Sequence, residues 1–233
     1  MNPTFLPSTA QLQELFNREI AAAGGTVSDT YNDGRRLFLR AILPQVREVR
    51  SRDQVQGGVA LRATDCQIQV HPYLFRQVCR NGAIMAQSLQ TRLVQRLEET
   101  PFAAPAEYEV AEILAEVQEV VRACCDREVF AANAEQMRSA VDLDADLLLT
   151  MLPHLLQRAE ILGTDVFPQI LDRYLSGAEG QSAFGLMNAV TALARDTQDP
   201  ELRWGLEELG GGVPALLKPR HRREGAAAVA LRA

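Results

Sequence analysis

The chain has 233 residues, 47% of them hydrophobic and 23% charged, which allows one large domain or two small ones with a buried core. It has no apolar run of the ~20 residues that a membrane span needs and no secretory signal, so we expect a cytoplasmic protein without a membrane partner. Its four cysteines lack Cys-x-x-Cys spacing and its three histidines are scattered, so we predict no metal site and no cofactor.

Charge is distributed unevenly along the chain. Residues 1–97 carry 12 arginines against 7 acidic residues, a net charge of +5, whereas residues 98–217 carry −15 and residues 218–233 carry +4. An anionic partner would therefore meet the N-terminal part or the tail. All basic residues except Lys218 are arginine. Arginine suits bidentate contact with phosphate, although a GC-rich genome produces the same preference.

The chain begins with a predicted helix. Ser8 or Thr9 can cap it, its apolar residues recur on one face, and Gly24 and Gly25 end it after about Ala23. Residues 28–34 are polar, which predicts a loop. We expect residues 1–34 to form an N-terminal helix and loop.

From residue 35 the hydrophobic period changes from helical to alternating, which predicts strands. A first strand covers residues 35–43, where Pro44 interrupts it. Residues 55–63 and 66–71 alternate on either side of a turn at residues 64–65, which predicts a hairpin. Gly57 and Gly58 indicate a bulge or a close approach by another backbone. A fourth apolar stretch, residues 73–79, leads to a turn at Asn81 and Gly82.

Helical periodicity dominates the remaining sequence. We predict helices over residues 83–99, from Pro105 to Cys124, and over 144–161, 165–176, 181–195 and 199–209, with Gly210 to Gly212 ending the last one. The fold class is therefore α+β, with an antiparallel β-sheet and hairpin in the N-terminal part and a helical C-terminal part. Residues 35–99 form a β-rich module with a following helix, 100–212 a helical region, and 213–233 a basic, flexible tail.

Arginines in the β-rich module are candidate nucleic-acid contacts. Arg36 and Arg40 share a strand face with an aromatic residue, and basic residues interleaved with an aromatic suit single-stranded nucleic acid. An ordinary solvated sheet face is the alternative. The candidate contacts are Arg36, Phe38, Arg40, Arg62, Arg76 and Arg80.

The sequence gives little support to catalysis. It has neither a phosphate-binding Gly-Lys-Ser/Thr loop nor a Gly-x-Ser-x-Gly elbow. His71 lies near Cys66 and Cys79 in sequence, but a structural histidine is the simpler interpretation. Three aspartates resemble the start of a calcium loop, yet its required glycine and glutamate positions hold Leu147 and Pro153. We predict no catalytic residue and no enzyme. The three aspartates are Asp142, Asp144 and Asp146.

Two segments together resemble a known family. Phe75-Arg-Gln-Val-Cys-Arg-Asn-Gly82, after the strand Val59-Ala-Leu-Arg62, and Phe184-Gly-Leu-Met-Asn-Ala-Val-Thr191 are similar to motifs of a phage- and plasmid-associated family catalogued as domain of unknown function 932. The resemblance covers about residues 35–195 and implies a mobile-element context. Read by themselves, Asn81 and Gly82 suit a turn, and Asn188 and Thr191 share a helix face and form a structural polar clasp or a ligand contact.

We therefore expect a non-catalytic nucleic-acid-binding protein of mobile-element type that handles single-stranded DNA, as a monomer or a homo-oligomer. The alternative is a protein-interaction module whose acidic helical region docks a basic partner. The +5 charge of the N-terminal part favours the first function, and the −15 charge of residues 98–217 favours the second.

Overall fold

The fold was analysed in a computed structural model that describes residues 7–65, 67–86, 94–95, 107–140, 145–177 and 182–216. The described residues form an N-terminal β-sheet and helices that lie mostly in the C-terminal half, so the predicted α+β class is confirmed. The elements in chain order are α1 (Thr9–Ala22), β1 (Thr26–Asn32), β2 (Leu37–Arg50), β3 (Asp53–Ala63), β4 (Gln67–Arg76), β5 (Asn81–Ile84), β6 (Val94–Gln95), α2 (Glu107–Cys124), α3 (Arg127–Ser139), α4 (Ala145–Leu162), α5 (Val166–Ser176), α6 (Ala183–Asp196) and α7 (Pro200–Leu216).

The sheet is antiparallel and curled, with the strand order β1-β2-β3-β4-β5. The short strand β6 pairs with Gln67 and Ile68 at the start of β4, while β5 pairs with the end of β4. Because neighbouring strands alternate in direction, the β2–β3 and β4–β5 turns lie at one end of the sheet and the β1–β2 and β3–β4 turns at the other. The end with the β2–β3 and β4–β5 turns is named the β4–β5 end, and the candidate site lies there.

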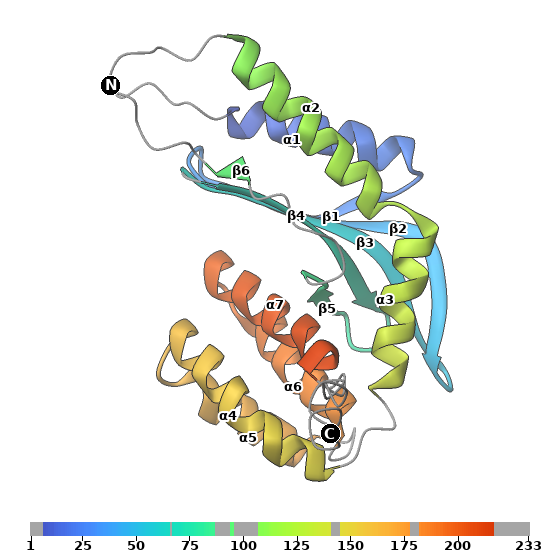
Figure 1. Ribbon diagram of the computed structural model, residues 1–233, viewed down its shortest axis with the longest axis vertical. Coiled ribbons are helices and arrows are strands. Elements are labelled where there is room, and N and C mark those ends of the chain that lie inside the picture. Colours follow the sequence, from blue (N-terminus) through green and yellow to red (C-terminus); the bar gives the residue numbers. More distant parts are fainter. Residues whose placement is uncertain are drawn as a thin grey trace, which may run out of the picture.

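Helices α1 and α2 cover one face of the sheet (Figure 1). Ser8 caps α1 as predicted, because its side chain accepts from the Gln11 N–H and the Gln11 side chain accepts from the Ser8 N–H. The predicted apolar stripe of α1 packs on the inward residues of the strands, so the alternation read from the sequence correctly identified this face. The stripe consists of Leu12, Leu15, Phe16 and Ile20.

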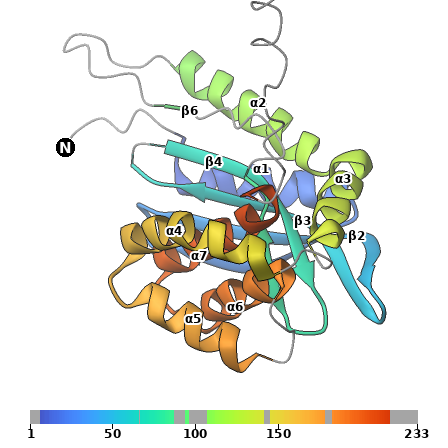
Figure 2. The same ribbon diagram turned by 60° about the horizontal axis from the view of Figure 1, so that its bottom comes forward.

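Helices α6 and α7 cover the opposite side, and α4 and α5 form an outer layer on them (Figure 2). Trp204 of α7 packs against Phe38 of β2 with ring centroids 6.1 Å apart. Helix α3 packs along β2, β3 and β4. Both faces of the sheet are therefore covered by helices, and buried apolar side chains on each face form the core.

The predicted close approach at the Gly57–Gly58 pair is confirmed. A Cβ atom at Gly58 would stand 2.2 Å from the Ala41 carbonyl oxygen on the paired strand β2. Strand β2 continues through Pro44, where its register with β3 shifts between Ile42 and Val46. The proline therefore perturbs the ladder without ending the strand, which corrects the predicted interruption.

Several predicted boundaries need correction. The polar loop over 28–34 is largely the edge strand β1, whose alternate side chains are exposed, so its polar composition hid it. The helix predicted over 83–99 does not begin there, because residues 81–84 pair with β4 as β5; residues 87–93 and 96–106 lie outside the described residues. Helix α3 was missed, and Asp142, Asp144 and the tail from 217 also lie outside the described part.

Candidate functional site

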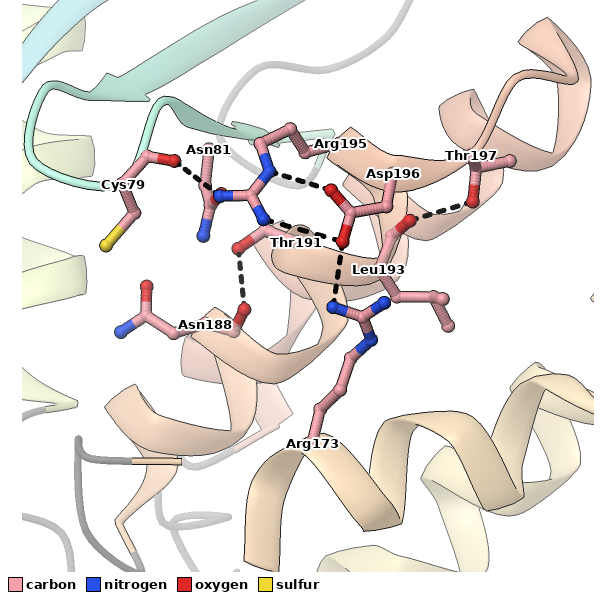
Figure 3. A network of polar contacts seen from close by, with 9 residues as sticks. All are labelled: Cys79, Asn81, Arg173, Asn188, Thr191, Leu193, Arg195, Asp196 and Thr197. Carbon is pink, nitrogen blue, oxygen red and sulfur yellow. Dashed lines mark hydrogen bonds and ion pairs between the residues drawn. The ribbon is translucent and has the colours of Figure 1, made fainter. Parts of the chain in front are cut away.

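Two polar segments that are more than a hundred residues apart meet at the β4–β5 end. Asn81 begins β5 opposite Arg76, and Asn188 and Thr191 lie on α6, which packs on β5. Arg195 of α6 joins them, because its Nη1 donates to the Cys79 carbonyl oxygen at 2.9 Å and to Asn81 Oδ1 at 3.5 Å (Figure 3). The fold therefore assembles the Asn81 and Asn188 segments into one site.

The geometry at Asn81 and Gly82 differs from the predicted turn. Arg80 is the residue with positive φ, at 53°, so the left-handed position precedes Asn81. Gly82 is in β5, where a Cβ atom would stand 2.1 Å from Cζ of Tyr73 on β4. Glycine is needed there because the Tyr73 ring packs across it.

Three arginines border this site, and each has a carboxylate partner. Arg76 donates from Nε to both carboxylate oxygens of Asp53, at 2.8 and 2.7 Å. Arg173 of α5 and Arg195 of α6 both donate to Asp196, at 3.0 and 2.9 Å. The Arg195 hydrogen bonds lower the pKa of Asp196, so this carboxylate stays ionised between its two guanidinium partners.

A cavity of about 240 Å³ lies among these residues. Two of its lining side chains are more than nine-tenths buried and carry a polar atom without a hydrogen-bond partner in the described part of the chain: Asn188 Nδ2 and Tyr174 Oη. Burial raises the pKa of Tyr174, so its hydroxyl remains protonated at neutral pH and is able to donate. Polar lining residues of the cavity include Arg76, Asn81, Arg173, Tyr174, Asn188 and Arg195.

Within the described residues, the hydrogen bonds of the Thr191 side chain stay inside α6 and reach no other element. Its Oγ1 donates to the Met187 carbonyl oxygen at 2.9 Å and contacts the Asn188 carbonyl oxygen at 3.3 Å, both within α6. Such a bond returns the hydroxyl to its own helix. Of the pair predicted to act together, only Asn188 faces the cavity.

The candidate contacts on β2 are not on an exposed face, which corrects the prediction for Phe38 and Arg40. Phe38 is fully buried against Trp204. Arg40 donates from Nε to Glu207 at 2.7 Å and from Nη1 to Asp29 at 3.0 Å. The alternation was read correctly, but helix α7 covers this face, which the strand pattern alone does not reveal.

The other four candidates have different surroundings. Arg76 is buried and borders the cavity. Arg62 is partly buried and donates to Glu201 at 2.6 Å, and Arg36 is half-buried beside Asp33. Arg80 is exposed on the β4–β5 turn. Only Arg76 and Arg80 thus lie at the β4–β5 end.

Sequence reasoning missed Arg173, Tyr174 and Arg195. They come from helices of the acidic half of the chain, and no motif connects them to the β-rich module. The resemblance motif around Asn188 was the nearest signal, because one helical turn on α6 separates its last residue, Thr191, from Arg195.

His71 has structural surroundings. It lies in the middle of β4, with its ring centroid 5.9 Å from that of Trp204, and its Nε2 is 3.6 Å from Glu208 Oε1. Burial lowers the pKa of His71 to about 4. Cys66 lies outside the described residues, and Cys79 belongs to the turn that borders the cavity.

Searches for two other kinds of feature gave no candidate. Among the described residues, no group of three or more histidine, cysteine or acidic side chains could hold a metal ion. None of the helices in the described ranges combines the length and the apolar composition required to cross a membrane.

Comparison of the chain with protein-family models, curated proteins and solved structures finds no match. The resemblance to the phage- and plasmid-associated family therefore stays a prediction, based on the two motifs alone. The case for a function rests on the site geometry.

Proposed function

We propose that this protein binds nucleic acid at the β4–β5 end of the sheet, by contacts to phosphate groups. The observation that carries the proposal is the convergence of arginines from three separate segments on this end. Arg76, Arg173 and Arg195 border the cavity, and guanidinium groups bind phosphate oxygens in a bidentate manner.

Exposed arginines on the two adjacent turns extend this basic surface. The turns lie side by side, because the Gln77 N–H of the β4–β5 turn donates to the Gln54 carbonyl oxygen of β3 at 3.2 Å. Arg52 and Arg80 are both exposed, one on each turn. The proposal thus retains the nucleic-acid function expected from the sequence but moves its contacts from the sheet face to the turns. The contacts would be to phosphate, so binding would depend little on base sequence.

Fluorescence anisotropy with a labelled single-stranded oligonucleotide at increasing salt concentration tests this proposal. We expect binding that weakens steeply with salt, with a slope of about −0.7 per phosphate contact in a plot of log K against log[salt]. Arg52→Gln and Arg80→Gln should each weaken binding and reduce the slope.

Arg35→Gln is the matched control. Arg35 is exposed on the β1–β2 turn, at the opposite end of the sheet, so its loss should leave affinity unchanged. An absence of binding at low salt, where phosphate contacts are strongest, would reject the proposal. Equal losses of oligonucleotide affinity in Arg35→Gln and Arg80→Gln would show that the nucleic acid does not bind at the β4–β5 end.

Protein interaction through the outer helical layer is a second candidate. Ile161 of α4 is 81% exposed and Leu175 of α5 is 62% exposed, and both have acidic neighbours in the chain, Glu160 and Asp172. Exposed apolar side chains among acidic ones suit a partner with apolar and basic residues. The test is affinity capture from lysate with the full chain and with Ile161→Ser/Leu175→Ser. A partner that both proteins retain equally would contradict this candidate.

A further inference from the structure

We propose that the cavity at the β4–β5 end binds the terminal phosphate group of a nucleic-acid strand. This inference rests on the proposed function, and it assigns a specific ligand group to a specific cavity.

The cavity presents hydrogen-bond donors that have no acceptor. Asn188 is 6% exposed and its Nδ2 lacks a partner, and Tyr174 is 9% exposed and its Oη lacks a partner, in both cases among the described residues. A buried polar group without a partner is unfavourable, because it has lost its hydrogen bonds to water. An occupant that supplies acceptor oxygens to both groups would recover this free energy on binding.

Figure 3 shows Asn188 together with Arg173 and Arg195. The Arg195 guanidinium lies between the Cys79 carbonyl and the Asp196 carboxylate, and Asn188 lies about two turns earlier on α6. The cavity is bordered by β4, β5, α5 and α6 together, so its walls come from four elements of the fold. Such a site is positioned by the fold rather than by a single loop.

The charge of the cavity favours an anion. Arg173 and Arg195 share the single carboxylate of Asp196, which leaves this pair with a net charge of +1. The hydrogen bond from Arg195 to Asp196 also raises the pKa of Arg195, so its charge is fixed at any physiological pH. Paired guanidinium groups around a single acid are an arrangement suited to phosphate oxygens.

A terminal phosphate fits these donors better than an internal one. An internal phosphodiester has one negative charge and two free oxygens. A terminal phosphate has three acceptor oxygens and a charge of about −1.5 to −2 at pH 7, because its second pKa is about 6. Its three oxygens offer one acceptor each to Asn188, Tyr174 and a guanidinium group of the lining. The second negative charge of the terminal phosphate is also attracted by the net positive charge of Arg173, Arg195 and Asp196.

The experiment compares three oligonucleotides of the same sequence, with a 5′-phosphate, with a 3′-phosphate and with hydroxyl groups at both ends. We expect one phosphorylated end to bind at least about tenfold more tightly than the hydroxyl form, which corresponds to one charge-assisted hydrogen bond. Asn188→Asp and Tyr174→Phe should remove the preference while retaining salt-dependent binding. Thr191→Val, on the same helix, should retain the preference.

Inorganic phosphate provides a second measurement that needs no variant. Millimolar phosphate should raise the melting temperature of the wild-type protein more than chloride at equal ionic strength, and should abolish the end preference in competition. Equal affinity for all three oligonucleotides would overturn this inference and leave the proposed function standing. Stabilisation by phosphate without oligonucleotide binding would reject the proposed function and retain the anion site.

Discussion

Two groups of ion-paired arginines in this molecule have different surroundings, because the first is buried and the second is partly exposed. Between the sheet and α7, Arg40 is 2% exposed and donates to Glu207 and Asp29. At the β4–β5 end, Arg173 and Arg195 share Asp196 and border a cavity. The first arrangement joins a strand to a helix across a packed interface. The second leaves space beside its charges.

An unpaired donor alone does not mark a binding site. Nη2 of Arg40 also lacks a hydrogen-bond partner within the described residues, yet it belongs to the interface between β2 and α7. At the β4–β5 end, the two residues that carry unpaired atoms, Asn188 and Tyr174, line a cavity. We therefore expect substitutions in the first region to change stability and those in the second to change ligand binding.

Arg40→Met should give the largest loss of stability. It leaves the buried Glu207 carboxylate with Arg203 as its remaining arginine partner, at 3.3 Å, and removing one member of a buried pair costs about 3–5 kcal/mol. Chemical denaturation monitored by circular dichroism measures this loss.

Arg36→Met is the matched control for Arg40→Met. Arg36 pairs with Asp33 at a half-exposed position, where solvent screens the ion pair, so its loss should change stability little. Arg40→Met/Glu207→Gln should recover part of the loss, because no uncompensated carboxylate remains. Equal losses in Arg40→Met and Arg36→Met would contradict the structural role of the buried network.

Stability should also fall in acid because of His71. Its folded-state pKa of about 4 lies below the usual 6.5, so the unfolded chain binds the proton more readily. The stabilising contribution is complete above about pH 6.5 and is lost as the pH falls toward 4. The loss is about 3 kcal/mol over this interval. Denaturant titrations at several pH values measure it.

His71→Gln should flatten the dependence of the unfolding free energy on pH between pH 4 and 6.5. Burial raises the pKa of the facing carboxyl, Glu208, whose titration changes stability in the opposite direction, so the difference between wild type and variant isolates His71. Profiles with identical slopes between pH 4 and 6.5 would show that His71 does not titrate in this way.

The outline of the fold was predictable because the alternation of apolar residues and the helical stripes are local signals. The errors arose where tertiary contact decides the structure. The glycines at 210–212 suggested a helix end, but α7 continues through them, and a Cβ atom at Gly211 would stand 2.0 Å from the Ile84 carbonyl oxygen. Glycine permits α7 to approach β5 here, and a single sequence does not distinguish this use from termination.

The candidate site was only partly predictable for the same reason. Asn81 and Asn188 were identified from polar motifs, but nothing in the sequence joins them to Arg173 or Tyr174 on α5. The arginines of the strands were the clearer signal, but ion pairs with acids more than a hundred residues away make two of them, Arg40 and Arg62, structural residues. Charge partners across such separations depend on the packed fold.

Gly82→Ala tests how tightly the site is packed. The added methyl group would meet the Tyr73 ring within a paired strand, and overpacking of this kind costs about 1–3 kcal/mol. Gly205→Ala in α7 is a suitable control, because its Cβ would meet the flexible end of the Leu162 side chain. Thermal denaturation should show the larger loss for Gly82→Ala, and the reverse order would contradict the packing of Tyr73 across β5.

Thr191→Val should give the smallest effect and the sharpest separation of stability from binding. The Thr191 hydroxyl bonds within its own helix, and valine has nearly the same shape, so the expected loss is below about 1 kcal/mol. Asn188→Asp, three residues away on the same helix, should instead change phosphate binding, because it replaces the Nδ2 donor with a negative charge. Parallel denaturation and binding measurements on the two variants are decisive. A loss of end preference in Thr191→Val would mean that the helix face as a whole, and not Asn188, determines binding.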